Sequence, residues 1–378
     1  MTTVAEQIVT AVHPADQLDA GLIDEWRQLE ARSRLGNACL SPEFLVPAMR
    51  HLEPDARPWV ARAELGEGHG RLVGIATFTR SGPTAKIPFP HLRLFETKHT
   101  YINGFLLDQE HAAAALEALL QAVFAHQGWR LGLYVNLLQT ESDCYRLLTA
   151  QEVPFHWEEF INLPRAIVKP VPDFVEKHLP SRLKADLRRK WKRLGELGKP
   201  EWRFVHSNPE IAGALENLLH LENMGWKGEG GSSLLSSSAE AQFFRELTAG
   251  FAQRDKVFIL ELCLDGVAIS SQSVFLSGNG AFLFKLGWNP EYRPFGPGAL
   301  NAVELAQRLQ EMGKELVVLD SCATTGSWFE RYWRESYSLV SGFIVPRGLG
   351  SGAVSSLKAL YKLKRKLVER WQRDSEED

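Results

Sequence analysis

The segment Asn289–Leu300, which reads Asn-Pro-Glu-Tyr-Arg-Pro-Phe-Gly-Pro-Gly-Ala-Leu, is the part of the chain best suited to bind an anion. It follows an apolar strand-like run and leads into a helix-like run ending at Met312. Glycines allow close backbone approach, and the first N–H groups of a helix lack intrahelical acceptors. Pro294 and Pro297 have no N–H. The candidate phosphate ligands are therefore Arg293 and the N–H groups of Phe295, Gly296, Gly298, Ala299 and Leu300. The alternative is an ordinary helix-entry turn.

Two carboxylates are candidate general bases. Asp320 ends the apolar run Leu-Val-Val-Leu-Asp, and strand ends of such sheets open into a cleft. Partial burial there would raise its pKa into a useful range for deprotonating an amine or hydroxyl. A helix cap or a salt bridge is the alternative role. Glu222 ends an apolar-periodic helix, where it could be a base, an acceptor ligand or an exposed helix terminus.

Lys285 interrupts the run Phe-Leu-Phe-Lys-Leu of a third apolar strand. A lysine in such a strand either faces solvent by alternation or is held inward. Held inward, its ammonium could polarise a thioester carbonyl or pair with a carboxylate. Cys322 is a less suitable nucleophile, because no histidine lies close in sequence to activate it. We expect it to be a buried structural thiol.

The composition is that of a globular chain with ample apolar material. Of 378 residues, 44% are hydrophobic and 24% charged, and the formal net charge is −3, so general nucleic-acid binding is not indicated. The four cysteines show no CxxC spacing and the histidines no HExxH spacing, so we expect no disulfide, no metal and a reducing, cytoplasmic location. The N-terminus has no signal-peptide pattern, and no apolar run reaches the ~20 residues that span a bilayer.

The two halves of the chain show the same order of expected elements. Each half has helices, then three strands, a helix, a strand, a helix and a strand. In the first half we expect helices at 18–29, from Ser41-Pro42, 111–126 and 142–150, and strands at 59–64, 72–79, 92–102, 131–138 and 155–163. In the second half we expect helices at 173–197, 209–222, 239–252, 300–312 and 327–334, and strands at 257–264, 267–276, 281–288, 316–320 and 338–345. Asp265-Gly266 and the stretch 277–280 are hairpin turn signals.

This repetition predicts an α/β (α+β) protein with two similar domains, each a mixed, mostly antiparallel sheet flanked by helices. The expected divisions are 1–165, 166–350, and a basic helix with an acidic tail at 351–378. The first half reads Thr-Tyr-Ile-Asn-Gly-Phe-Leu after its third strand and lacks the Arg-x-x-Gly-x-Gly pattern. We therefore expect the second domain alone to bind the donor.

The order and the motifs together resemble the GNAT acetyltransferases. The second half is most similar to the group described as BioF2-like or cellulose-biosynthesis proteins, which are related to the double-GNAT Fem transferases. The resemblance is carried by the basic helix from Ser181, Glu222 with Trp226-Lys227, Phe284-Lys285, the Gly-Pro-Gly loop, and Asp320-Ser-Cys before Trp328 and Trp333.

The resemblance implies acyl transfer from acyl-CoA, or from an acyl carrier protein, to an amine or hydroxyl acceptor, without a tightly bound cofactor. Polysaccharide, lipid and envelope synthesis are the implied settings. Trp226 and Lys227 are then expected to bind substrate, and Tyr332 to protonate the leaving thiolate, although its neighbours also suit a core position. The alternatives are a Fem-like transferase using aminoacyl-tRNA, for which net charge is unfavourable, and an inactive adaptor.

Two basic helices could serve partners. One, at 182–193, has leucines and Trp191 on one side and a dense basic face on the other, which suits a carrier protein, nucleotide phosphates, anionic lipid or tRNA. The second, at 357–371, could lie on a membrane surface. Either face could also be simply solvated. The loop 228–238, rich in glycine and serine, is a candidate lid.

Overall fold

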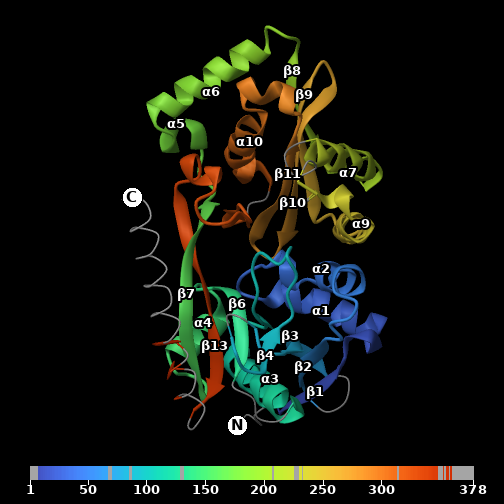
Figure 1. Ribbon diagram of the computed structural model, residues 1–378, viewed down its shortest axis with the longest axis vertical. Coiled ribbons are helices and arrows are strands. Elements are labelled where there is room, and N and C mark those ends of the chain that lie inside the picture. The colour runs from blue at the N-terminus through green and yellow to red at the C-terminus, as the bar shows by residue number, and fades with distance from the viewer. Residues whose placement is uncertain are drawn as a thin grey trace, which may run out of the picture. The chain divides into compact units, whose positions relative to one another are not determined.

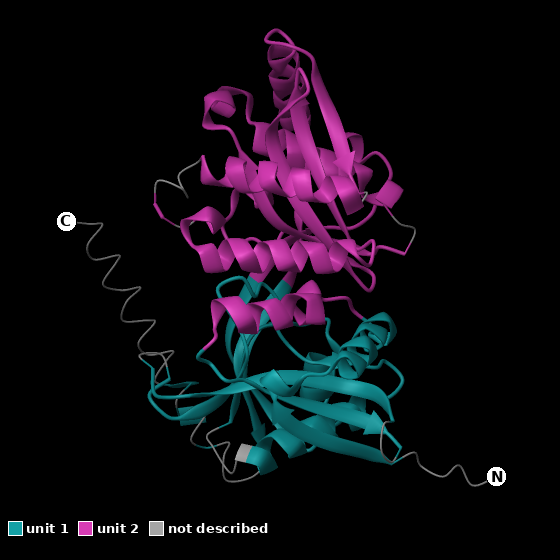
Figure 2. Ribbon diagram, turned by 90° about the vertical axis from the view of Figure 1, so that its right-hand side faces the viewer, with its two compact units in different colours: residues 1–34, 55–163, 338–378 teal, residues 35–54, 164–337 magenta. Residues whose placement is uncertain are grey.

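The computed structural model describes residues 7–66, 70–84, 87–127, 132–206, 208–224, 230–231, 233–312 and 315–347, with 352, 355–356 and 358–359 (Figure 1). These residues fold into two compact units (Figure 2). Unit 1 is Met1–Arg34, Asp55–Leu163 and Ser338–Asp378, and unit 2 is Leu35–Pro54 and Pro164–Tyr337. The break after Leu163 lies next to the expected one after residue 165, whereas Leu35–Pro54 and the strand after Tyr337 are grouped with the opposite halves.

Unit 1 is built on a mixed sheet with the strand order β1-β2-β3-β4-β6-β13. Its neighbours are antiparallel except for β4 and β6, which are parallel. The elements are β1 Ile8–Pro14, η1 Ala15–Gln17, α1 Ala20–Arg32, β2 Trp59–Leu65, β3 Arg71–Ser81, β4 His91–Leu94, β5 Leu106–Leu107, α3 Ala112–Gln127, β6 Leu133–Gln139, α4 Asp143–Thr149, β7 Phe155–Val168 and β13 Glu335–Pro346. The strands β7 and β13 contribute residues to both units.

Unit 2 has the strand order β8-β9-β10-β11-β12-β7, again antiparallel except for the pair β11–β12. Its elements are η2 Ala38–Leu40, α2 Pro42–Pro47, η3 Ala48–Leu52, α5 Phe174–His178, α6 Ser181–Leu194, β8 Pro200–Val205, α7 Asn208–Asn223, η4 Leu234–Ser236, α9 Ser238–Ala252, β9 Val257–Leu264, β10 Val267–Ser277, β11 Gly280–Trp288, η5 Pro290–Phe295, α10 Pro297–Met312, β12 Val318–Asp320 and η6 Trp328–Arg331.

The predicted repetition is confirmed by the strand pairing. Each unit has three antiparallel neighbours, β2-β3-β4 and β9-β10-β11, followed by a parallel pair whose two strands are joined through a helix, α3 or α10. The predicted α/β class with a mostly antiparallel sheet is therefore correct. The Asp265-Gly266 turn is also correct, with both residues at positive φ as a two-residue hairpin requires.

Several predicted elements differ in extent. The single helix expected at 173–197 is wrong, because Pro180 has an extended backbone and separates α5 from α6. The helix expected at 327–334 is only the short turn η6, and the strand expected at 92–102 ends at Leu94. The strands β1 and β8 were not expected. The helix α10 begins at Pro297, three residues before the expected start, which places Gly298 and Ala299 in its first turn.

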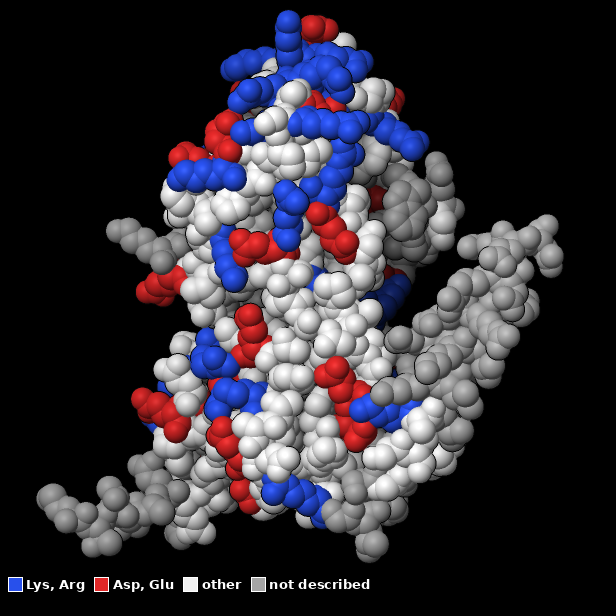
Figure 3. Space-filling view, turned by 90° about the vertical axis from the view of Figure 1, so that its left-hand side faces the viewer, with Lys and Arg blue, Asp and Glu red and all other residues white. Residues whose placement is uncertain are grey.

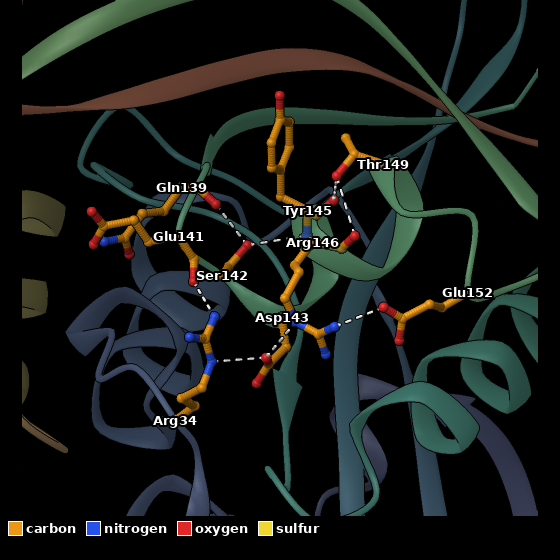
Figure 4. Close-up of polar contacts among 9 residues, drawn as sticks. All are labelled: Arg34, Gln139, Glu141, Ser142, Asp143, Tyr145, Arg146, Thr149 and Glu152. Atoms are coloured by element: carbon orange, nitrogen blue, oxygen red, sulfur yellow. Dashed lines mark hydrogen bonds and ion pairs between the residues drawn. The ribbon is translucent and has the colours of Figure 1, made fainter.

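In unit 1, Arg34 fixes the start of α4 (Figure 4). Its Nε donates to Asp143 Oδ1 at 2.8 Å, and its Nη2 donates to the Glu141 carbonyl. The Ser142 side chain caps the helix by accepting from the Tyr145 N–H. Asp143 also lies 3.7 Å from Arg146, which in turn bonds Glu152. These contacts hold the segment after α1 against the start of α4, so the cluster has a structural role.

In unit 2, the helices α2 and α9 pack together on the sheet. Phe44 meets Phe243 edge-on with centroids 5.4 Å apart, and Glu43 pairs with Arg254 at 2.8 Å. Phe284 of β11 stacks on Phe244 of α9. The residues Leu35–Pro54 are therefore part of the unit that contains the candidate site.

The other face of the sheet in unit 2 is covered by α10. Here Gln272 of β10 donates to the Asn301 carbonyl at 2.9 Å and to its Oδ1 at 3.1 Å, and Asn301 donates to the Leu260 carbonyl and to Ser270 Oγ. All three polar side chains of this network are fully buried. The Gln272 Oε1 atom has no partner among the described residues, but these four bonds hold α10 in one position on the sheet.

Candidate functional site

The glycine segment forms a tight turn at the start of α10. η5 is capped by Asn289, whose side chain accepts from the Glu291 N–H at 3.0 Å. Gly296 ends η5 with φ 58° and ψ 51°, a left-handed conformation that glycine adopts without strain. Gly298 is buried, and a Cβ there would lie 3.2 Å from Leu286 and Trp288. The first glycine therefore serves the turn, and the second allows α10 to pack closely on β11.

Most of the predicted anion donors in this turn already have acceptors. The Gly296 N–H donates to the Arg293 carbonyl at 3.1 Å. Ala299 and Leu300 both donate to the Gly296 carbonyl, at 3.0 and 3.1 Å. The Gly298 N–H has no acceptor within the part of the chain that the structure describes. The turn therefore offers an anion fewer N–H groups than the sequence suggested.

Cations of α6 surround the same turn. The Lys190 side chain lies against Gly296, with its Nζ 3.2 Å from where a Cβ would be. The Arg193 guanidinium lies over the Phe295 ring, 5.3 Å from its centroid, and Arg293 is exposed. Positive charge at a helix N-terminus adds to the dipole in favouring an anion. Lys190, which sequence reasoning did not single out, is brought here by packing between α6 and η5.

The strand β11 leads to the turn and has an open edge. It pairs with β12 only through Gly280, Ala281 and Phe282. From Leu283 to Trp288, β10 is its one strand partner among the described residues. The backbone groups that face away from β10 can therefore bond a ligand lying in the position of an added strand. Such a ligand would run along β11 towards η5 and the start of α10.

Lys285 lies beside an irregularity in this strand. It pairs with Ser273 of β10, and the next pair is Val274 with Leu283, so Phe284 is an extra residue in β11. A bulge of this kind leaves a residue unpaired and re-aims its neighbours. The Lys285 side chain is buried, and its Nζ is 5.7 Å from the Phe284 ring centroid. Of the two orientations considered from the sequence, Lys285 therefore has the inward one, which a functional role requires.

Asp320 is fully buried at the end of β12 and holds three donors. Its Oδ1 accepts from Arg165 at 3.2 Å and from the Cys322 N–H at 2.5 Å, and its Oδ2 accepts from the Tyr337 hydroxyl. Burial raises the pKa of Asp320 above its ordinary value, although the Arg165 guanidinium acts in the opposite direction. Both roles considered from the sequence, salt bridge and pKa-shifted carboxyl, are present in the geometry.

Glu222 is buried at the end of α7. Its Oε2 accepts from the Leu234 N–H at 2.8 Å, which fixes the turn η4. The backbone of Glu222 lies so close to Gly287 of β11 that a Cβ there would be 2.4 Å from the Glu222 nitrogen. This carboxylate is not the exposed helix terminus considered from the sequence. Trp226 and Lys227 lie outside the described residues, as do residues 228, 229 and 232 of the proposed lid at 228–238. The roles of Trp226, Lys227 and the lid stay predictions.

Tyr332 and Cys322 belong to the interior of unit 2. Tyr332 lies in the hydrophobic core with Phe329 and Trp333, the core position considered from the sequence, and its ring meets that of the exposed Trp328 edge-on. Cys322 is buried with φ 50°, and burial raises the pKa of its thiol well above the usual value. A thiol that remains protonated is a poor nucleophile.

Within the described residues, one group of side chains in unit 1 has the chemistry of metal ligands. Asp108, Glu110 and His111 of unit 1 come together closely enough to be considered as ligands. The Asp108 carboxylate, however, accepts from Arg32 at 2.8 Å and from the Glu110 N–H at 3.0 Å. These bonds account for the cluster as a structural one. Within the described residues, no helix is long and apolar enough to cross a membrane.

Comparison with known proteins agrees with this geometry. Residues 181–324, which include α6, β11, the turn, α10 and β12, match the acetyltransferase (GNAT) domain family. None of the curated proteins compared matches the sequence. Unit 2 therefore contains a GNAT acetyltransferase domain.

Solved structures show the same fold over nearly the whole chain. The chain is similar to FemX, with 12% identity and a TM-score of 0.57 over 89% of this chain and 98% of that one. It is similar to L-PGS from Bacillus licheniformis, with 12% identity and a TM-score of 0.55 over 91% and 96%. It is also similar to the C-terminal domain of a putative lysylphosphatidylglycerol synthetase from Agrobacterium fabrum, with 9% identity and a TM-score of 0.53 over 89% and 95%. At these identities the likeness concerns the fold alone.

Proposed function

We propose that the chain transfers an acyl group from a phosphopantetheine thioester, on coenzyme A or on an acyl carrier protein, to an amine or hydroxyl acceptor. The observation that supports it most is the open edge of β11, which runs from the bulge at Lys285 to the cation-lined turn before α10. An extended arm with amide groups can lie along such an edge, with its phosphate at the turn. The thioester carbonyl then lies near Lys285.

Transfer proceeds by direct attack in a ternary complex. The acceptor nitrogen or oxygen attacks the thioester carbonyl, the new C–N or C–O bond forms, and the C–S bond breaks. The Lys285 ammonium stabilises the negative charge that develops on the carbonyl oxygen. The acceptor's proton passes to a carboxylate, for which Asp320 and Glu222 are the candidates, and the departing thiolate takes a proton from solvent. Sugar, lipid and other envelope precursors are the proposed acceptors.

The experiment is a thiol-release assay with acetyl-CoA and a panel of amine and hydroxyl acceptors. We expect acceptor-dependent release by the wild type and loss of release in Lys285→Ala. Lys256→Ala, which changes a lysine just before β9, is the matched control and should retain the rate. Release that does not depend on Lys285, or a folded protein that neither binds nor uses any thioester, would refute the proposal.

A second candidate function is aminoacyl transfer from aminoacyl-tRNA. The observation that favours it is the charge of α6, where Arg182, Lys184, Arg188, Arg189, Lys190, Lys192 and Arg193 accompany only Asp186. Phosphate contacts make such binding steeply dependent on salt. Tight binding of aminoacyl-tRNA that weakens with a steep salt slope, together with no use of thioesters, would favour this candidate over the first.

A further inference from the structure

We infer that the outer face of α6 docks an acidic acyl carrier protein, and that the thioester donor arrives on the arm of that protein. This inference rests on the proposed function and specifies its donor. The outer face is defined by Arg182, Arg189, Lys192 and Arg193, which are all exposed. Figure 3 shows Lys and Arg side chains gathered at the upper end of this view of the molecule, over the part of unit 2 where Figure 1 places α6.

The face adjoins the place where the phosphate of the arm would bind. Arg193 of the outer face lies over Phe295, and Lys190, on the adjoining flank of α6, lies against Gly296. A protein seated on the outer face could therefore pass a phosphopantetheine arm over the turn and along the open edge of β11. Docking and delivery of the arm would use adjacent surfaces of one unit.

The turn is better suited to one phosphate than to a diphosphate. The N–H groups of Gly296, Ala299 and Leu300 bond within the turn, and Pro294 and Pro297 have none. The donors left are the Gly298 N–H, the exposed Arg293 side chain and Lys190, which lies against Gly296 and also pairs with Asp186 at 2.8 Å. This is a small donor set. A carrier-bound arm presents a single phosphodiester here, whereas coenzyme A presents a pyrophosphate and a further phosphate.

Charge favours an acidic protein surface as the occupant. Arg182, Lys192 and Arg193 have no carboxylate partner among the described residues, whereas Lys184 and Arg188 pair with Glu176, at 3.1 and 2.7 Å. Complementary charges of this kind speed encounter and fix orientation. The basic surface is local, because the whole chain has a formal net charge of −3.

Two other anionic partners fit less well. A membrane surface would require apolar side chains to enter the lipid, but Leu183, Leu187 and Leu194 of α6 are buried in the core of unit 2. The second partner is tRNA, an extended polyanion. The helix α6 has 14 residues and is about 21 Å long, which matches one acidic helix of a small protein better.

The test is calorimetric titration of the full chain with a purified holo-acyl carrier protein of fatty acid synthesis, its apo form and coenzyme A. The variant is Arg182→Glu/Lys192→Glu, with circular dichroism to confirm folding. The control is Lys256→Glu. Lys256 lies just before β9, whereas the other end of β9, at Leu264, pairs with Pro200 in the strand that follows α6. The control therefore lies at the end of β9 away from α6. We expect the holo carrier to bind at least tenfold more tightly than coenzyme A. The double variant should weaken carrier binding at least tenfold without changing affinity for coenzyme A.

Each other outcome decides against the inference. Carrier affinity that is unchanged in the double variant, or coenzyme A binding as tightly as the holo carrier, would overturn it while leaving acyl transfer intact. Fluorescently labelled tRNA or anionic phospholipid vesicles binding to α6 in place of the carrier would also overturn it. Failure of the proposed function is recognised separately, because then neither acetyl-CoA nor acetylated carrier would support acceptor-dependent thiol release.

Discussion

Lys285 of β11 faces Ser273 of β10, and the register of the two strands shifts directly beyond this pair. Side chains of opposed residues lie on the same face of a sheet, so the lysine and the serine are neighbours. The Ser273 hydroxyl is fully buried and has no hydrogen-bond partner among the described residues. The Ser271 hydroxyl, two residues along β10 and so on the same face of the strand, also lacks a partner within the part of the chain that the structure describes, and a polar ligand on this face could bond both hydroxyls.

This relationship gives the first prediction, which concerns catalysis. Lys285→Ala should lower kcat by about 100-fold, as expected for loss of a donor to a developing oxyanion, and change KM much less. Lys285→Arg keeps the charge and should recover part of the rate. Steady-state kinetics of both variants beside Lys256→Ala would check this. A kcat within about threefold of wild type for Lys285→Ala would exclude a catalytic role.

The second prediction concerns Asp320 and pH. Burial raises the pKa of this carboxyl in the folded chain above 3.8, its ordinary value. Between the ordinary and the raised pKa, the folded chain holds a proton that the unfolded chain has lost. The contribution of Asp320 to the free energy of unfolding is therefore fully present below the ordinary pKa and is lost as the pH rises through the raised one.

The Asp320→Asn variant has no carboxyl group at this position to titrate, so it is the reference for the pH dependence of the wild type. We expect the free energy of unfolding of the wild type, minus that of the variant, to decrease as the pH rises from about 4 towards neutrality. Urea unfolding at several pH values measures it. A difference that increases with pH would show that Arg165 dominates over burial and holds the pKa below its ordinary value.

The third prediction concerns the network under α10. Asn301→Ala removes the donor to the Leu260 carbonyl and to Ser270, and one acceptor of Gln272. We expect a loss of about 2 kcal/mol in the free energy of unfolding, because buried partners are left unsatisfied. Gln272→Leu/Asn301→Leu should cost less than the sum of its single changes. Asn162→Ala, at an exposed position of β7, is the control and should change stability by less than about 0.5 kcal/mol. Additive losses would contradict the coupling.

The repeated order of strands and helices was predictable because it depends on local patterns. Alternation and turn residues locate β9, β10 and β11 and the Asp265-Gly266 hairpin between the first two. The sequence missed β8, an edge strand in which the burial alternates weakly and the first residue is proline. The prediction also joined α5 and α6 into one helix across Pro180, because basic and apolar residues continue the helical period on both sides of the proline.

The site was predictable only in part, for the reason that packing between distant segments cannot be read from spacing. The position of the glycine segment before α10 follows from local sequence, whereas the sequence left open whether Lys285 faces solvent or the interior. Arg165 and Tyr337 reach Asp320 from β7 and β13, and no local motif indicates either contact. The engagement of the Ala299 and Leu300 N–H groups depends on the left-handed turn at Gly296, which the sequence permits but does not specify.

The fourth prediction compares two glycines of unit 2. Gly296→Ala forces a side chain into the left-handed region and should lower the free energy of unfolding by about 1 kcal/mol. Gly213 lies inside α7 with open space around its missing Cβ, so Gly213→Ala should raise stability by roughly 0.5–1 kcal/mol. Chemical denaturation of both variants provides the comparison. Equal effects of the two changes would contradict the strained turn.

The central claim is that a phosphopantetheine thioester lies along β11 with its phosphate at the start of α10. The most direct measurement is hydrogen–deuterium exchange of the full chain with and without saturating acetyl-CoA and acetylated carrier protein. We predict that at least one donor slows exchange in residues 283–300 and that Arg293→Ala weakens this protection. A donor that binds but protects only other segments would contradict the account, as would a folded wild type that is protected by neither.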